Sequence, residues 1–158
     1  MKVIFLDIDG VLNNQKHTVE LCDNLLGREQ YYEIMREIGE IPFDYRSCKL
    51  IQQLAMETGA KIVLYSTWRL NPASIDILSK YAKIEIYDKT PCISVSYSRG
   101  LEIQQWLENH PMVTNYVIID DDMDMLESQM SHFVHIDNMI GFIKENLVQC
   151  KEILNREE

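Results

Sequence analysis

The feature that most constrains this chain is a series of short apolar runs, separated by stretches long enough to hold a helix. The runs are rich in β-branched residues and cover 3–6, 61–65, 84–87 and 116–119, with a weaker one at 133–136. Runs that are apolar on both faces are typical of strands in a parallel sheet covered by helices. The alternation predicts a three-layer, Rossmann-like α/β fold with a central, mostly parallel sheet.

The stretches between the runs carry helical patterns with recognisable ends. Polar residues that can cap a helix begin three of them: Ser47, Asn71 and Ser98. Gly59 can end the first helix, and Pro111 stops the third. We expect two further helices, a short one over 123–130 and an amphipathic one over 140–154.

Residues 13–46 interrupt the alternation, because they contain no run of the central-strand kind. A helix-like piece, Glu29–Ile38, lies between Gly27 and Gly39. We interpret 13–46 as a small helical, cap-like insertion above the sheet. A length of 158 residues otherwise suits a single domain over 1–158.

Charge and composition disfavour several classes of function. The chain has 15 basic and 25 acidic residues, and a formal net charge of −10 disfavours an extended nucleic-acid footprint or binding to an anionic membrane. No apolar run approaches the roughly 18 residues of a membrane span, and the first ten residues lack the apolar core of a secretory signal. The four cysteines include no CxxC pair, which suits reduced thiols. We therefore expect a cytoplasmic protein without a membrane partner; the oligomeric state stays open.

Polar residues gather where three of the predicted strands end. They are Asp7 and Asp9 after the first, Ser66 to Arg69 after the second, and Asp120 to Asp122 after the fourth. The carboxyl ends of parallel strands meet at one edge of a sheet, which is where such folds bind ligands. Repulsion between carboxylates would raise their pKa values there unless a cation were present. Oxygen ligands in this number favour Mg²⁺ over zinc or copper.

These residues resemble the haloacid dehalogenase (HAD) superfamily of phosphohydrolases. The matching strings, in the order of that superfamily's motifs, are VIFLDIDGVL at 3–12, KIVLYS at 61–66, a cation at a helix start, and YVIIDD at 116–121. The string STWR at 66–69 and the chain length also resemble the small HAD domains associated with RNA-repair proteins. The resemblance implies a HAD fold and a Mg²⁺-dependent phosphatase that works through an aspartyl phosphate.

The first motif carries the reacting groups in that mechanism. Asp7 would attack phosphorus and bind Mg²⁺, and Asp9 would protonate the leaving oxygen before activating the hydrolytic water. The resemblance also makes the backbone carbonyl of Asp9 a Mg²⁺ ligand. Gly10 permits the sharp turn that follows the strand.

The second motif would bind the phosphoryl group. Ser66 is expected to donate to a phosphoryl oxygen, with Thr67 as a weaker candidate. Arg69 can bind the phosphate or a second substrate anion, and a surface ion pair is the alternative. For Trp68 we favour packing over stacking on a substrate.

The third motif needs a cation that neutralises the nucleophile and the phosphoryl group. Arg99 follows the capping Ser98, where a cation opposes the helix dipole, and it is our preferred candidate; Lys89 is the alternative. Glu102 on the same helix can orient Arg99, although an exposed acid is the more ordinary interpretation.

The fourth motif supplies the remaining metal ligands. The resemblance implies that Asp121 binds Mg²⁺ directly and that Asp120 supports the site from behind or through water. Asp122 and Asp124 can either bind metal or cap the short helix from Met123.

The substrate is the part that the sequence defines least. A lid of about 34 residues at 13–46 would leave the site open to a polynucleotide end. The acidic net charge favours contact with only one or two terminal nucleotides, or with a small phosphomonoester. Tyr31 and Tyr32 can stack on a base or pack within a helix. Two other functions stay possible: a catalytically silent HAD-fold binding protein, and a phosphoacceptor receiver domain.

Overall fold

Five parallel strands form the centre of the molecule. In the computed structural model, the described residues are 1–25, 27, 29–30, 33, 43–93 and 98–156. The strands are β1 (Lys2–Leu6), β2 (Lys61–Leu64), β3 (Ile86–Lys89), β4 (Asn115–Asp120) and β5 (Phe133–His135). Their order across the sheet is β3-β2-β1-β4-β5. All pairs are parallel, and Leu6 lies beside Leu64 on one side and Ile119 on the other, so the three central strands end together.

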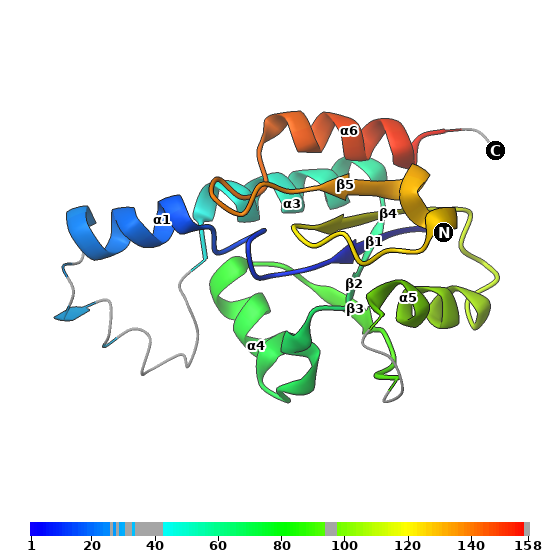
Figure 1. Cartoon of the computed structure of the whole chain (residues 1–158), viewed down its shortest axis with the longest axis horizontal. Coiled ribbons are helices and arrows are strands. Elements are labelled where there is room, and N and C mark those ends of the chain that lie inside the picture. Colours follow the sequence, from blue (N-terminus) through cyan, green and yellow to red (C-terminus); the bar gives the residue numbers. More distant parts are fainter. Residues whose placement is uncertain (26, 28, 31–32, 34–42, 94–97, 157–158) are drawn as a thin grey trace.

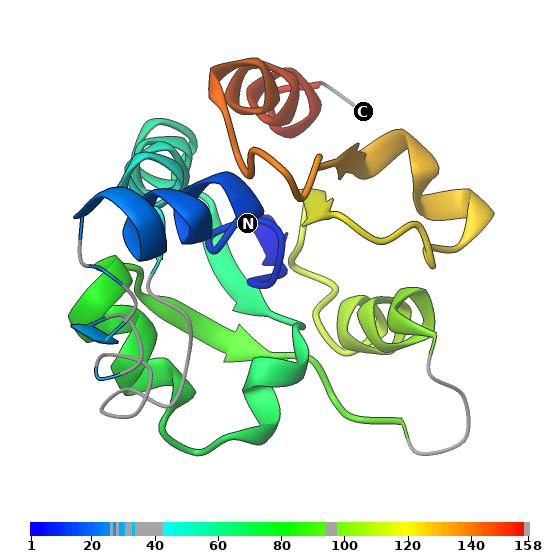
Figure 2. The ribbon, with the colours of Figure 1, turned by 60° about the vertical axis from the view of Figure 1, so that its left-hand side comes forward.

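Helices cover both faces of the sheet, which gives the three layers predicted (Figure 1). The α-helices are α1 (Gln15–Val19), α3 (Tyr45–Thr58), α4 (Ser74–Ile77), α5 (Arg99–Glu108) and α6 (Lys144–Leu154). α3 and α6 lie together on one face and α5 on the other (Figure 2). Shorter helices extend this set: π-helical segments over Glu20–Leu25 and Leu78–Ala82, and 3-10 helices over Thr67–Leu70 and Glu127–His132.

The core follows from the alternation of side chains along β1. Ile4 and Leu6 pack toward α3 and α6, whereas Val3 and Phe5 pack toward Trp106 on α5. All four of these β1 side chains are fully buried. A central strand that is apolar on both faces is therefore explained by two separate hydrophobic layers.

The third strand begins two residues later than its apolar run indicated. Lys83 has a left-handed backbone (φ 55°), and Ile84 follows in the turn, where its N–H donates to Leu78 O. Ile84 is 1% exposed, so it is apolar because it packs into the core from the turn. Pairing with β2 begins only at Ile86.

Several helix starts also differ from the predicted positions. α3 is capped by Asp44, whose Oδ1 accepts from Arg46 N at 2.9 Å, while Ser47 lies inside the helix and donates to Phe142 O. Asn71 Oδ1 accepts from Ala73 N, but α4 begins only at Ser74. In each case a second polar residue within three positions of the start made the choice ambiguous.

In place of the expected helix over 123–130, the structure has a 3-10 helix that begins four residues later, at Glu127–His132. Asp124 does not cap it, because Asp124 Oδ2 accepts from Arg99 N, at 3.4 Å, at the start of α5. α5 itself ends at Glu108, three residues before Pro111. Proline therefore follows this helix without being the residue that ends it.

Within the predicted insertion, the structure describes α1 and the π-helical segment Glu20–Leu25, neither of which the sequence pattern predicted. Most of the expected piece 29–38, with Tyr31 and Tyr32, lies outside the described residues. Among the described helices, none is long and apolar enough to cross a membrane.

Candidate active site

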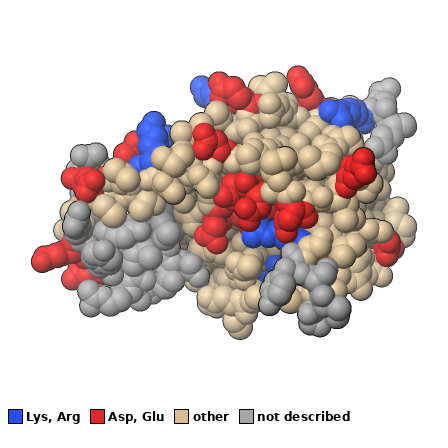
Figure 3. All heavy atoms as spheres, viewed as in Figure 1, with Lys and Arg blue, Asp and Glu red and all other residues tan. Residues whose placement is uncertain are grey.

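Polar side chains converge at the carboxyl ends of β1, β2 and β4. Asp7 follows β1, Ser66 follows β2, and Asp120 is the last residue of β4. The backbone continues the sheet one step further, because Asp7 N donates to Ile119 O at 3.0 Å. The face seen in Figure 3 carries acidic side chains around a small basic patch near its centre. The strand ends thus bring together side chains from three sequence motifs.

Asp7 is a buried carboxylate with an unusual environment. It is 1% exposed, and its Oδ1 has no hydrogen-bond partner among the described residues. Burial and the negative charge of Asp120 raise its pKa well above the ordinary value, although Arg99 and a hydrogen bond with Ser66 act in the opposite direction. The metal-free fold therefore loses stability as the pH rises through the pKa of Asp7. A cation at Oδ1 would remove this cost.

Both carboxylate oxygens of Asp120 accept hydrogen bonds from the protein. Its Oδ2 accepts from Tyr65 Oη at 2.5 Å and from Arg99 Nη1 at 2.6 Å, and its Oδ1 accepts from Asp122 N at 2.8 Å. The side chain of Asp120 has no exposed surface. These bonds suit a residue that supports the site from behind. Tyr65 was missed from the sequence, because it ended an apolar run and looked like part of the strand.

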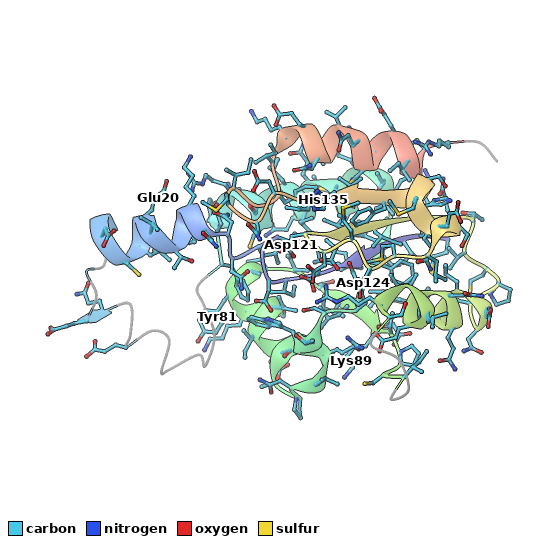
Figure 4. The ribbon with its side chains drawn as sticks, viewed as in Figure 1. Glu20, Tyr81, Lys89, Asp121, Asp124 and His135 are labelled. Carbon is cyan, nitrogen blue, oxygen red and sulfur yellow. The ribbon has the colours of Figure 1, made fainter. Side chains whose placement is uncertain are left out.

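Asp121, labelled in Figure 4, follows β4 and approaches Gly10 closely. Burial and the neighbouring Asp120 raise the pKa of Asp121. Gly10 has a left-handed backbone (φ +73°), and a Cβ there would lie 2.5 Å from the Asp121 carboxylate. Glycine is therefore required both for the turn after β1 and for the close approach of Asp121.

The three carboxylates can hold a divalent cation. One ligand atom from each of Asp7, Asp120 and Asp121 lies within 4.8 Å of the others. Two further features fit a metal: the buried Asp7 Oδ1, which accepts no hydrogen bond from the described residues, and the space that Gly10 leaves beside Asp121. All the donors are oxygens, which suits Mg²⁺.

Asp9 is exposed, but two donors hold its carboxylate. Asn13 Nδ2 donates to Oδ1 at 2.7 Å, and Trp68 Nε1 lies 3.2 Å from Oδ1 and 3.1 Å from Oδ2. Asn13 Oδ1 in turn accepts from Gly10 N at 2.9 Å. Trp68 does pack, against Phe43, as the sequence favoured, but its contact with Asp9 was not foreseen. Asn13 was also missed, and its position four residues after Asp9 is the one local signal for it.

Arg99 is the cation that the structure brings to the carboxylates. Its Nη1 lies 3.4 Å from Asp7 Oδ1 and 2.6 Å from Asp120 Oδ2, and its Nη2 lies 3.7 Å from Asp122 Oδ2. Burial alone would lower the pKa of Arg99, but Asp7 and Asp120 outweigh it and raise the pKa. Lys89, labelled in Figure 4, is exposed at the end of the edge strand β3 and has no ion pair with another described residue.

Arg69 and Glu102 form a buried ion pair. Arg69 Nη2 lies 2.5 Å from Glu102 Oε2, and both side chains are under 10% exposed. Arg69 also donates to the carbonyl oxygens of Tyr65 and Ser66, and Glu102 accepts from Ile93 N. Three expectations are therefore wrong: Glu102 is not an exposed acid, it pairs with Arg69 and not with Arg99, and the ion pair of Arg69 is not at the surface. The pair braces the turn after β2.

Breaking this pair should destabilise the fold. In a Glu102→Gln variant, the buried guanidinium of Arg69 keeps its charge but loses its counter-ion, and we expect the free energy of unfolding to fall by about 3 kcal/mol. Urea denaturation measures this. The matched control is Glu57→Gln, because Glu57 pairs with Lys151 at the surface and its loss should leave the midpoint nearly unchanged. Equal midpoints for wild type and Glu102→Gln would contradict a bracing role.

A pocket of about 340 Å³ opens beside Arg99. It is lined by Thr67, Arg69, Leu70, Cys92, Ile93, Arg99 and Glu102. Thr67 is exposed there, so its hydroxyl can meet a ligand, while the hydrogen bonds of Arg69 are largely used within the protein. The pocket adjoins the carboxylates through Arg99, which gives a substrate room next to the candidate metal ligands.

One family of known proteins matches the chain. The family model described as the HAD domain in Swiss Army Knife RNA repair proteins matches residues 3–147, which include every candidate site residue. No curated protein and no solved structure matches the chain significantly.

Proposed function

The chain belongs to the HAD superfamily, in the family of HAD domains found in Swiss Army Knife RNA repair proteins, and on this basis we propose that it is a Mg²⁺-dependent phosphatase. It would hydrolyse a phosphomonoester through an aspartyl phosphate on Asp7. The observation that carries the proposal is the buried Asp7 Oδ1, which accepts no hydrogen bond from the described residues and lies among carboxylates and Arg99 at the strand ends. Membership of this family argues against the receiver-domain alternative.

Each side chain has a role in this proposal. Asp7 attacks phosphorus, Ser66 and Thr67 donate to phosphoryl oxygens, and Arg99 balances the charge of Asp7 and the incoming phosphoryl group. Asp9 protonates the leaving oxygen and then accepts a proton from water. Of these residues, Thr67 and Arg99 line the pocket beside the strand ends, where a substrate would lie.

Mg²⁺ would be held by Asp7, Asp121 and the backbone carbonyl of Asp9, with Asp120 in support. When bound, the ion supplies positive charge that offsets the phosphoryl oxygens and the crowded carboxylates. Asp120 supports the ligands from behind because Tyr65 and Arg99 already occupy its Oδ2. Asp121 is thus the direct ligand and Asp120 the supporting residue, as the resemblance implied.

The substrate would be a terminal phosphate on a nucleotide or a polynucleotide end, or a small phosphomonoester. The matched family consists of HAD domains in RNA repair proteins, and this context favours a nucleic-acid terminus as the substrate. The net charge of −10 argues against a long footprint, so contact would be limited to one or two nucleotides. The segment 13–46 would act as a small lid that sets substrate choice without taking part in the chemistry.

Hydrolysis of p-nitrophenyl phosphate with Mg²⁺ and with EDTA tests the proposal. We expect activity with Mg²⁺, none with EDTA, and poor activity with Ca²⁺, because a compact octahedral site suits the smaller ion.

Asp121→Ala should raise the Mg²⁺ concentration needed on the order of 100-fold and Asp120→Ala by about tenfold. Full activity in EDTA would contradict the metal requirement. A larger rise in the Mg²⁺ requirement for Asp120→Ala than for Asp121→Ala would show that Asp120 is the direct ligand. A folded wild type without activity on any phosphoester would favour the silent binding protein instead.

A further inference from the structure

The carboxylate of Asp9 is held from two sides although it lies at the surface. Asn13 Nδ2 contacts Oδ1 alone, at 2.7 Å, whereas the indole N–H of Trp68 lies about equally far from both oxygens. An exposed aspartate without such partners would sample several rotamers. Two fixed donors therefore restrict the direction in which Asp9 points.

Trp68 is itself fixed by its surroundings. The side chain is almost fully buried and packs against Phe43, with ring centroids 5.3 Å apart. Its backbone belongs to the 3-10 helix after β2, where Trp68 N donates to Ser66 Oγ and Trp68 O accepts from Ser74 Oγ at 2.5 Å. A buried tryptophan bonded at both ends of its backbone gives its N–H a defined position.

We propose that Trp68 is a positioning residue that aims Asp9 at the leaving group, an inference that rests on the proposed phosphatase function. Oδ1 of Asp9 accepts from both Asn13 and Trp68, whereas Oδ2 accepts from Trp68 alone, so Oδ2 has the freer lone pair to carry a proton. In the first step a bond forms between Asp7 and phosphorus, the bond to the leaving oxygen breaks, and the proton on Oδ2 moves to that oxygen. In the second step water bonds to phosphorus, its proton returns to Asp9, and the Asp7–phosphorus bond breaks.

The same contacts tie Asp9 to both ends of the segment 13–46. Asn13 begins that segment and touches Asp9 directly, and Phe43, near its end, touches Trp68. Residues from both ends of the segment therefore help to hold Asp9 in place, Asn13 directly and Phe43 through Trp68.

Leaving-group dependence tests the positioning role. A p-nitrophenolate leaves without much help from an acid, whereas an alkoxide needs a proton, and kcat/KM reports only the steps up to departure of the leaving group. For Trp68→Phe we expect kcat/KM to fall about tenfold or more with an alkyl phosphate, since general acids contribute roughly 10²–10⁴-fold, and to change less than about twofold with p-nitrophenyl phosphate. A merely structural defect would lower both values by the same factor.

Trp106→Phe is the matched control. Trp106, on α5, is the other tryptophan and is also buried. Its Nε1 donates to Asp88 Oδ2 on β3 at 2.7 Å, away from Asp9. Loss of the hydrogen bond of Trp106 should leave kcat/KM unchanged for both the alkyl phosphate and p-nitrophenyl phosphate. If Trp68→Phe does not fold, the Trp106→Phe protein is produced with benzothienylalanine in place of tryptophan, which keeps the shape of Trp68 and removes only its N–H.

Equal losses on the two substrates, or no loss on either, would overturn the role of Trp68 while leaving the phosphatase in place. A wild type that hydrolyses neither substrate would instead remove the proposed function, and the inference with it. A loss confined to the alkyl phosphate supports the inference.

Discussion

An Asp7→Asn variant should lose turnover on the order of 10⁴-fold or more while keeping its fold. The amide has nearly the shape of the carboxylate but cannot attack phosphorus. Because burial and Asp120 raise the pKa of Asp7, its ionised form costs stability at neutral pH. The neutral variant should therefore be at least as stable as the wild type when no metal is present.

Phosphate release and thermal unfolding, measured on the same preparations, check both parts. Asp88→Asn is the matched control. Asp88 lies on the edge strand β3, accepts a hydrogen bond from Trp106, and is apart from the three carboxylates. Wild-type turnover by folded Asp7→Asn would contradict the nucleophilic role. A large loss of stability at neutral pH would instead show that Asp7 is mainly a structural residue.

A Gly10→Ala variant should also lose activity, for a steric reason. The added Cβ would lie 2.5 Å from Asp121 Cγ and Oδ2, so the carboxylate must move away from the proposed metal position. We expect the Mg²⁺ concentration needed for activity to rise on the order of 100-fold, as for the loss of a ligand.

Gly59→Ala separates this clash from backbone strain. Gly59 has nearly the same left-handed φ (+68°) at the end of α3, with nothing within 4 Å of an added Cβ. Both variants should lose roughly 1–2 kcal/mol of stability from the left-handed backbone, and only Gly10→Ala should change the Mg²⁺ dependence. Titration of activity with Mg²⁺ measures the difference. An unchanged Mg²⁺ dependence in Gly10→Ala would show that Asp121 does not contact the ion.

The sequence predicted the sheet and the residues at its edge, because both depend on local patterns. Apolar runs with acids directly after them placed Asp7 and Asp120 at neighbouring strand ends, and the parallel register then brings them together. The choice of Arg99 rested on a cation at an unfavourable helix start, and the structure brings that side chain to both carboxylates. The roles of these residues stay predictions until activity is measured.

The contacts that hold the site could not be predicted, because they join residues far apart in the chain. Trp68 and Asp9 are 59 residues apart, Tyr65 and Asp120 are 55 apart, and Arg69 and Glu102 are 33 apart. No periodic pattern relates such positions, since the pairing follows from strand order and helix packing. Tyr65, Trp68 and Glu102 also belong to residue types whose ordinary interpretation is packing or a surface charge.

Direct detection of the covalent intermediate tests the central claim. Enzyme mixed with p-nitrophenyl phosphate and Mg²⁺ is quenched in acid during the first turnover, reduced with borohydride and examined by peptide mass spectrometry. An aspartyl phosphate is reduced to homoserine, so we expect homoserine at position 7, only when substrate is present, and none in Asp7→Asn. Turnover without any modification at position 7, or with modification at Asp9 instead, would contradict the proposed mechanism.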